Sequence, residues 1–162
     1  MQKELLSHAE TVTLSGFGDP FGSPTYLALL STLNQNDFPN MKQVRLHTNG
    51  QRLTPEMWQN LPGLQPLVSE IEISIDAATE QTYKHNRPGG DFPQLLDNLN
   101  FLENCDCKLT LSMVVQQNNW REIPQLLKLA KGYDAEVYLD FIHLLKQLPD
   151  PQITIGNLAY LL

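Results

Sequence analysis

Hydrophobic residues follow two different periods along this chain. Short apolar, β-branched runs occupy residues 11–15, 43–47, 70–75, 108–115 and 136–142. Helix-like segments, most of them with leucines at helical spacing, cover residues 23–33, 54–60, 79–103 (with a break near Arg87) and 119–131. This alternation of strand-like and helix-like segments predicts βαβ units and a parallel sheet, which is an α/β fold.

Capping residues mark where several of the predicted helices begin. Ser23, Thr54 and Thr79 stand directly before helical segments, and Asn119 precedes Trp120 in the same way. Side-chain oxygens of these residue types accept hydrogen bonds from the first free N–H groups of a helix. We therefore expect all four residues to act as helix caps.

The number of predicted strands limits which architecture the chain can form. Five strands cannot close an eight-stranded barrel, so we expect a partial (β/α) TIM-like barrel over residues 1–147, with two open edges. One of these edges would need a cover or a protein partner. Residues 1–8 have a helical pattern and precede the first strand. Residues 148–162 form a tail with two prolines, either an extra helix or a disordered end.

Composition narrows the class of protein. The chain has 162 residues, of which 41% are hydrophobic, enough for one core. Its net charge is −7 and its basic residues are scattered, which argues against nucleic acid as a partner. It contains no apolar run of about 20 residues and no signal peptide, so we expect no membrane contact and a cytosolic protein.

The two cysteines, Cys105 and Cys107, are too close in sequence for a good structural disulfide. We interpret them as incidental free thiols of a protein in a reducing compartment.

Unusual residues follow the first two predicted strands. In parallel β/α folds the ligand lies at the carboxyl ends of the strands, where the loops converge. The segment 16–20 after the first strand contains Gly16, Gly18, Asp19 and Pro20. It predicts either a close backbone approach to a ligand or a tight turn before the cap at Ser23. The second strand ends in residues 47–50 (His-Thr-Asn-Gly), read as a plain turn or as ligand contacts, but not as a hairpin, because a helix follows.

Polar residues also follow the third and fourth strands. Strand alternation places Glu72, Ser74 and Asp76 on one face, where burial is costly without a partner. A polar ligand would supply that partner; alternatively, Ser74 and Asp76 bond to neighbouring backbone and cap the next helix. Arg87, beside a proline and two glycines, is a candidate clamp for a carboxylate or phosphate, or else a solvated loop residue. Gln117 follows the fourth strand and offers an amide at the same end of the sheet.

Taken in order, these segments resemble the radical SAM superfamily, especially the subgroup with a C-terminal auxiliary-cluster domain. Residues 14–20 are similar to the family's Gly-Gly-Glu-Pro motif, with Asp19 in place of the glutamate. Residues 48–50 (Thr-Asn-Gly) are identical to the family's strand-end signature, and residues 74–77 resemble its Ser-x-Asp-Gly. Residues 78–92 are similar to its next helix-loop-helix, with Arg87 at the arginine of that pattern, and residues 115–119 resemble the following strand end.

The resemblance implies a cofactor site and an iron–sulfur chemistry. It implies that S-adenosylmethionine binds at the strand ends, with Asp19 near the methionyl amino group and Ser74 near the ribose or methionine. The implied contacts are Gly16, Gly18, Asp19, Pro20, Thr48, Asn49, Ser74, Asp76, Arg87 and Gln117. The family also holds a [4Fe–4S] cluster on a C-x3-C-x2-C loop after the first barrel strand, and this sequence contains no such loop.

Two interpretations of the missing loop follow, and both remain open. In the first, which the helix-first beginning favours, the chain is a segment of a longer enzyme and is inactive alone for lack of the cluster. In the second, it is a cluster-free module that binds S-adenosylmethionine or another nucleotide, or binds a protein through its sheet edges. A lyase or isomerase that uses Asp19, Asp76 and His47 as acid–base groups is a weaker alternative, because nothing at metal-ligand spacing accompanies them. We predict no catalytic residue and no metal ligand in this chain.

Overall fold

A computed structural model describes residues 6–14 and 18–141 of the chain. Within this range five parallel strands form one sheet in the order β1-β2-β3-β4-β5. The strands are β1 (Thr11–Leu14), β2 (Gln43–Thr48), β3 (Val68–Ser74), β4 (Lys108–Val114) and β5 (Glu136–Asp140). The predicted α/β fold with five parallel strands is confirmed, and strand bounds differ from the predicted ones by at most two residues wherever both ends are described.

Helices connect each pair of neighbouring strands. They are α2 (Pro24–Leu30), α3 (Pro55–Gln59), α4 (Glu80–Asn86), α5 (Phe92–Leu102) and α6 (Ile123–Gly132), with two short 3-10 helices, η1 (Gln65–Leu67) and η2 (Trp120–Glu122). The helical pattern expected over residues 79–103 is thus two helices, α4 and α5, separated at Arg87, as the break in the sequence predicted. The helix expected at residues 1–8 and the tail 148–162 lie mostly or wholly outside the described residues.

Local hydrogen bonds explain where the helices begin. The Ser23, Thr54 and Thr79 side chains accept backbone N–H groups at the starts of α2, α3 and α4, as predicted. Asp91 does the same for α5, by accepting from the Gln94 N–H at 3.0 Å, and this cap was not predicted. Asn119 is a correction: its side chain makes no capping bond and instead turns inward.

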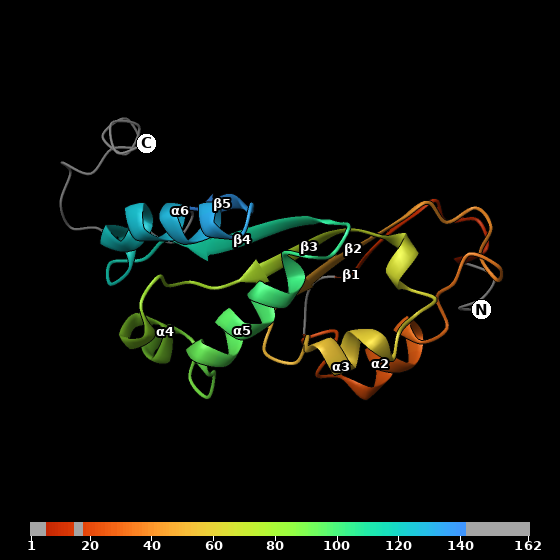
Figure 1. Cartoon of the computed structure of the whole chain (residues 1–162), viewed down its shortest axis with the longest axis horizontal. Coiled ribbons are helices and arrows are strands. Elements are labelled where there is room, and N and C mark those ends of the chain that lie inside the picture. Colours follow the sequence, from red (N-terminus) through yellow and green to blue (C-terminus); the bar gives the residue numbers. More distant parts are fainter. Residues whose placement is uncertain (1–5, 15–17, 142–162) are drawn as a thin grey trace.

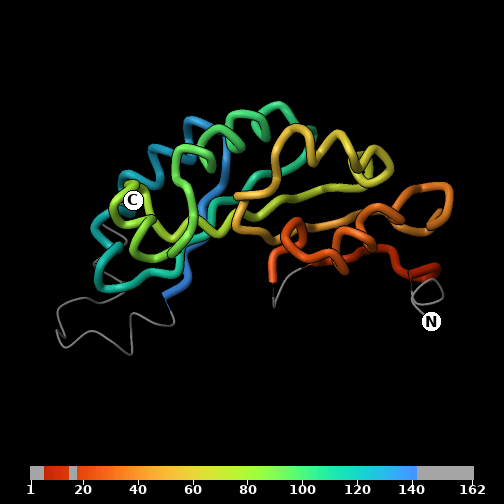
Figure 2. The backbone as a smooth tube through the Cα atoms, turned by 90° about the horizontal axis from the view of Figure 1, so that it is seen from below, coloured from red at the N-terminus to blue at the C-terminus, as the bar shows by residue number. Residues whose placement is uncertain are grey.

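The order of the strands explains which face of the sheet is covered. Strands that are neighbours in sequence are neighbours in the sheet, and parallel crossovers are right-handed, so the connecting helices fall on one face. Figure 1 shows α2, α3 and α5 along one side of the strands, and Figure 2 shows the earlier part of the chain (red to yellow) at one end of the molecule and the later part (green to blue) toward the other. The result is an open, partial β/α barrel with β1 and β5 at its two edges.

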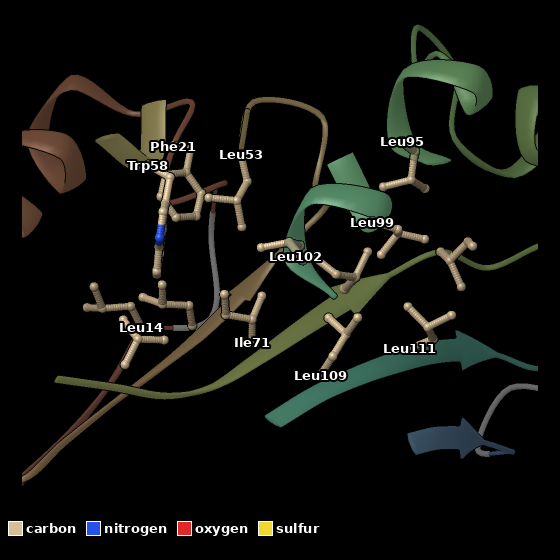
Figure 3. Packing of buried hydrophobic residues seen from close by; sticks show 14 of the residues in the cluster. Leu14, Phe21, Leu53, Trp58, Ile71, Leu95, Leu99, Leu102, Leu109 and Leu111 are labelled. Atoms are coloured by element: carbon tan, nitrogen blue, oxygen red, sulfur yellow. The ribbon is translucent and has the colours of Figure 1, made fainter. Parts of the chain in front are cut away.

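The core lies between this face and the helices. Leu95, Leu99 and Leu102 project from α5 toward strand residues such as Ile71 and Leu111 (Figure 3). All five side chains are at most 2% exposed. The opposite face, which we call the helix-free face because no helix of residues 6–14 and 18–141 covers it, carries polar side chains, including Arg45, Glu70 and Glu72. In the described part of the chain, no helix is long and apolar enough to cross a bilayer.

Candidate functional site

Two adjoining cavities open at the carboxyl ends of the strands. The smaller has a volume of about 280 Å³ and is lined by Gly18, Asp19, His47, Thr48, Asn49, Ser74 and Arg87. The larger, of about 710 Å³, lies toward the loop between α4 and α5 and shares Asp19, Asn49 and Arg87 with the first. Six of the ten predicted contact residues therefore line the smaller cavity, which we call the strand-end cavity.

Asp19 is fixed to the end of β2. Its Oδ2 accepts hydrogen bonds from Thr48 Oγ1 at 2.5 Å and from the Asn49 backbone N–H at 2.7 Å. Its Oδ1 accepts from the Phe21 N–H at 2.9 Å. A carboxylate has about four acceptor positions, so three protein bonds leave about one for a ligand. The Asp19 carbonyl oxygen also accepts the Gly22 and Ser23 backbone N–H groups, both at 3.0 Å, so residues 19–23 form a tight turn, as one interpretation expected. This turn also carries a carboxylate to the cavity.

The turn after β2 is held in place from several sides. Gly50 has a φ of +76°, which favours glycine, and a Cβ there would lie 2.6 Å from Leu95 Cδ1, so any other residue would be strained. The Asn98 side chain donates from α5 to the Gly50 carbonyl oxygen at 2.7 Å. Gln51 exchanges two hydrogen bonds of 2.8 Å with the backbone of Asp91. It has the form of a plain turn, and its hydrogen bonds join the end of β2 to the loop after α4.

Ser74 and Glu72 find partners on the neighbouring strand. His47 Nε2 lies 2.6 Å from Ser74 Oγ and 3.5 Å from Glu72 Oε1, and both contacts run across the helix-free face. Ser74 therefore has a hydrogen-bond partner without a ligand, and Glu72 lies beside the same imidazole. His47 and Ser74 both line the strand-end cavity, because they are the last residues of this face before the strands end.

Asp76 and Arg87 form an ion pair beside the same cavity. Arg87 Nη2 lies 2.6 Å from Asp76 Oδ2, and Asp76 Oδ1 accepts the Val114 backbone N–H at 2.7 Å. The Asp76 backbone has a φ of +53°, so the residue leaves the strand direction, and alternation with Ser74 does not extend to it. Arg87 Nε is buried and has no hydrogen-bond partner among the described residues. Arg87 is therefore not a solvated loop residue.

Some predicted contacts lie elsewhere. Gln117 is exposed and lines neither cavity, so the structure does not bring it to the other residues. Pro20 is buried and Asp76 stands behind Arg87, and neither lines a cavity wall. Gly16 lies outside the described residues. Both oxygens of Asp19 and of Asp76 are bonded to protein groups, and His47 Nε2 is bonded to Ser74 Oγ, so the three acid–base groups of the lyase or isomerase alternative have little support from this geometry.

Sequence reasoning missed residues that act over long separations. Glu122 of η2 bonds to the start of α4, and Asn86 donates its side-chain N–H to the Asp76 carbonyl oxygen at 2.8 Å. Asn98, which is 1% exposed, had a usable signal, because a fully buried asparagine on the apolar stripe of a helix needs a polar partner. Glu122 had no such signal, since it lies 44 residues from Ala78, to which it bonds.

The two cysteines lie at the opposite end of the sheet. Cys105 and Cys107 directly precede β4 and line a separate cavity with Lys108 and Glu136. Burial, with smaller contributions from Cys105 and Asp106, raises the pKa of the Cys107 thiol to about 12, and burial also raises the pKa of Cys105. Both thiols are therefore protonated near neutral pH, which is unfavourable for binding metals.

Comparison with known proteins adds one positive finding. The family model of the radical SAM superfamily matches residues 2–130 of this chain. No curated protein matches it. The matched range covers β1 to β4 and every residue that lines the strand-end cavity.

Proposed function

The chain belongs to the radical SAM superfamily, and we therefore propose that the strand-end cavity binds S-adenosylmethionine. The observation that carries the proposal is the pair of opposite charges on the cavity wall, Asp19 and Arg87. The methionyl part of S-adenosylmethionine is a zwitterion with an ammonium and a carboxylate group. A site with one carboxylate and one guanidinium matches both groups.

The bonding state of the two side chains supports these roles. Asp19 keeps about one acceptor position after its three protein bonds, which suits a single ammonium N–H. Arg87 uses one nitrogen for Asp76, while its buried Nε has no partner among the described residues. A guanidinium has five N–H donors, so Arg87 keeps others besides the one bonded to Asp76, and its place on the cavity wall lets them meet a ligand carboxylate.

The remaining wall residues suit the nucleoside. Thr48 and Ser74 carry hydroxyl groups, and Asn49 carries an amide, so the wall between the two charges is polar and uncharged. Gly18 has a φ of +98°, and a Cβ at this position would meet no atom within 4 Å, so its backbone is open to close approach by a ligand. We propose ribose or methionine contacts for Ser74 and Thr48, and we assign none to Gln117.

The chain's own residues do not fit an iron–sulfur cluster at this cavity. Such clusters are held by cysteine thiolates, whereas Cys105 and Cys107 lie at the far end of the sheet with raised thiol pKa values. Within residues 6–14 and 18–141, His, Cys, Asp and Glu nowhere gather in threes that could hold a metal ion. We therefore propose binding, and we assign no cleavage step to these residues.

Calorimetry of the full chain with S-adenosylmethionine tests the proposal. We expect saturable heat with the wild-type chain and at least a tenfold weaker affinity for Asp19→Asn, because an amide replaces the carboxylate that pairs with the ammonium. The matched control is Asp37→Asn, which removes the same charge from an exposed turn. No heat from the wild-type chain at millimolar ligand would contradict the proposal and favour an interaction module.

A further inference from the structure

The start of α4 is bound by a single carboxylate from a distant segment. Glu122 Oε2 accepts the backbone N–H groups of Ala78 at 2.7 Å and Thr79 at 3.1 Å. Its Oε1 accepts the Thr79 hydroxyl at 2.8 Å and also the Thr82 hydroxyl. These four bonds fill about all the acceptor positions of a carboxylate, so Glu122 has no capacity left for a ligand. Its negative charge is also favourable beside a helix N-terminus.

The other end of α4 carries the cavity arginine. The helix has seven residues, about 10 Å in length, and Arg87 follows its last residue. The Arg87 backbone N–H still donates to the Tyr83 carbonyl oxygen at 2.8 Å, so Arg87 continues the helical hydrogen bonding. A displacement of α4 would therefore move Arg87 with it.

The same turn also fixes the counter-ion of Arg87. Asn119, which is fully buried, donates its side-chain N–H groups to the carbonyl oxygens of Asp76 and Val114, both at 3.0 Å. Asp76 needs such support, because a left-handed backbone is unfavourable for a residue other than glycine. Residues 119–122 thus hold both the helix that carries Arg87 and the carboxylate that pairs with it.

We propose that Glu122 is a positioning residue that aims Arg87 at the carboxylate of S-adenosylmethionine. This inference rests on the proposed function, since it concerns the same cavity. Glu122 acts through α4 and does not touch the ligand. Its loss should weaken recognition of the ligand carboxylate more than recognition of the rest of the molecule.

Two ligands separate positioning from general stability. S-adenosylmethionine and decarboxylated S-adenosylmethionine differ only in the carboxylate, so the ratio of their dissociation constants measures recognition of that group. We expect a ratio of about tenfold or more for the wild-type chain, as for a charge-assisted hydrogen bond. We expect about threefold or less for Glu122→Gln, because its amide NH2 would face the donors of α4.

The control variant is Glu136→Gln, which removes the same charge from an exposed pair with Lys108 and should leave the ratio unchanged. If Glu122→Gln fails to fold by circular dichroism, Thr82→Val removes one of the four bonds from the α4 side and should lower the ratio less. Equal weakening of both ligands, with the ratio intact, would overturn the positioning role alone. Absence of wild-type binding would overturn the proposed function instead.

Discussion

The two ends of the sheet bond their polar side chains in different ways. At the amino ends of the strands, the ion pairs Lys42–Glu10 and Lys108–Glu136 join side chains that are 47–68% exposed. At the carboxyl ends, Arg87 and Asp76 are only 30% and 10% exposed. Exposed pairs are screened by water and contribute little, whereas buried polar groups must be matched one by one. The positions of polar side chains are therefore more strictly determined at the carboxyl ends of the strands than at the amino ends.

Gly50→Ala should produce the largest loss of stability, because it disrupts the turn that follows β2 at the carboxyl end of the sheet. The new Cβ would clash with Leu95 Cδ1 and sit on a backbone with φ of +76°. We expect the free energy of unfolding to fall by about 3 kcal/mol, from overpacking and strain together. Urea denaturation measures this. Gly132→Ala is the control: it meets no atom within 4 Å, and no loss is expected.

The partly buried Cys107 thiol at the amino end of the sheet predicts a pH dependence of stability. The unfolded Cys107 thiol, with a pKa near 9.0, loses its proton before the folded one, whose pKa is about 12. Between these two pKa values the folded state binds more protons than the unfolded state. The contribution of Cys107 to the free energy of unfolding is therefore fully present below pH 9 and is lost as the pH rises toward 12. Urea denaturation across this range should show a shallower fall for Cys107→Ala. An identical slope in both chains would contradict the assignment.

Glu10→Gln should have the smallest effect of the three. It removes a pair in which both side chains are at least 66% exposed, so we expect a change below about 0.5 kcal/mol in the free energy of unfolding. The same urea measurement applies. A loss comparable to that of Gly50→Ala would erase the difference between the two ends of the sheet.

Sequence patterns predicted what is local and missed what is distant. The caps at Ser23, Thr54 and Thr79 depend on donors within three residues, so the sequence was sufficient for them. Asp91 was missed although Pro93 in the next turn signalled a helix start, because the glycines before it were read as loop. Asn119 was misread as a cap, since nothing local shows that its side chain turns toward Asp76.

In the candidate site, too, local features were predicted from the sequence and distant contacts were missed. Strand ends placed Asp19, Thr48 and Ser74 at one edge of the sheet, because all parallel strands end on the same side. Arg87 was predicted as a clamp because it stands beside a proline and two glycines, and the family resemblance implied the same residue. The ion pair with Asp76 depends on the left-handed backbone at that residue, and no side-chain pattern in the sequence predicts this conformation.

The helix-free face of the sheet has a consequence for how this fold can change over time. Its side chains, such as Arg45, Glu70 and Glu72, stand opposite the apolar layer that stabilises the domain. Substitutions on this face alter the surface leading to the cavity while leaving the core packing intact. Evolution could therefore change which ligand such a sheet binds with little loss of folding stability. The same face is the natural target for engineering.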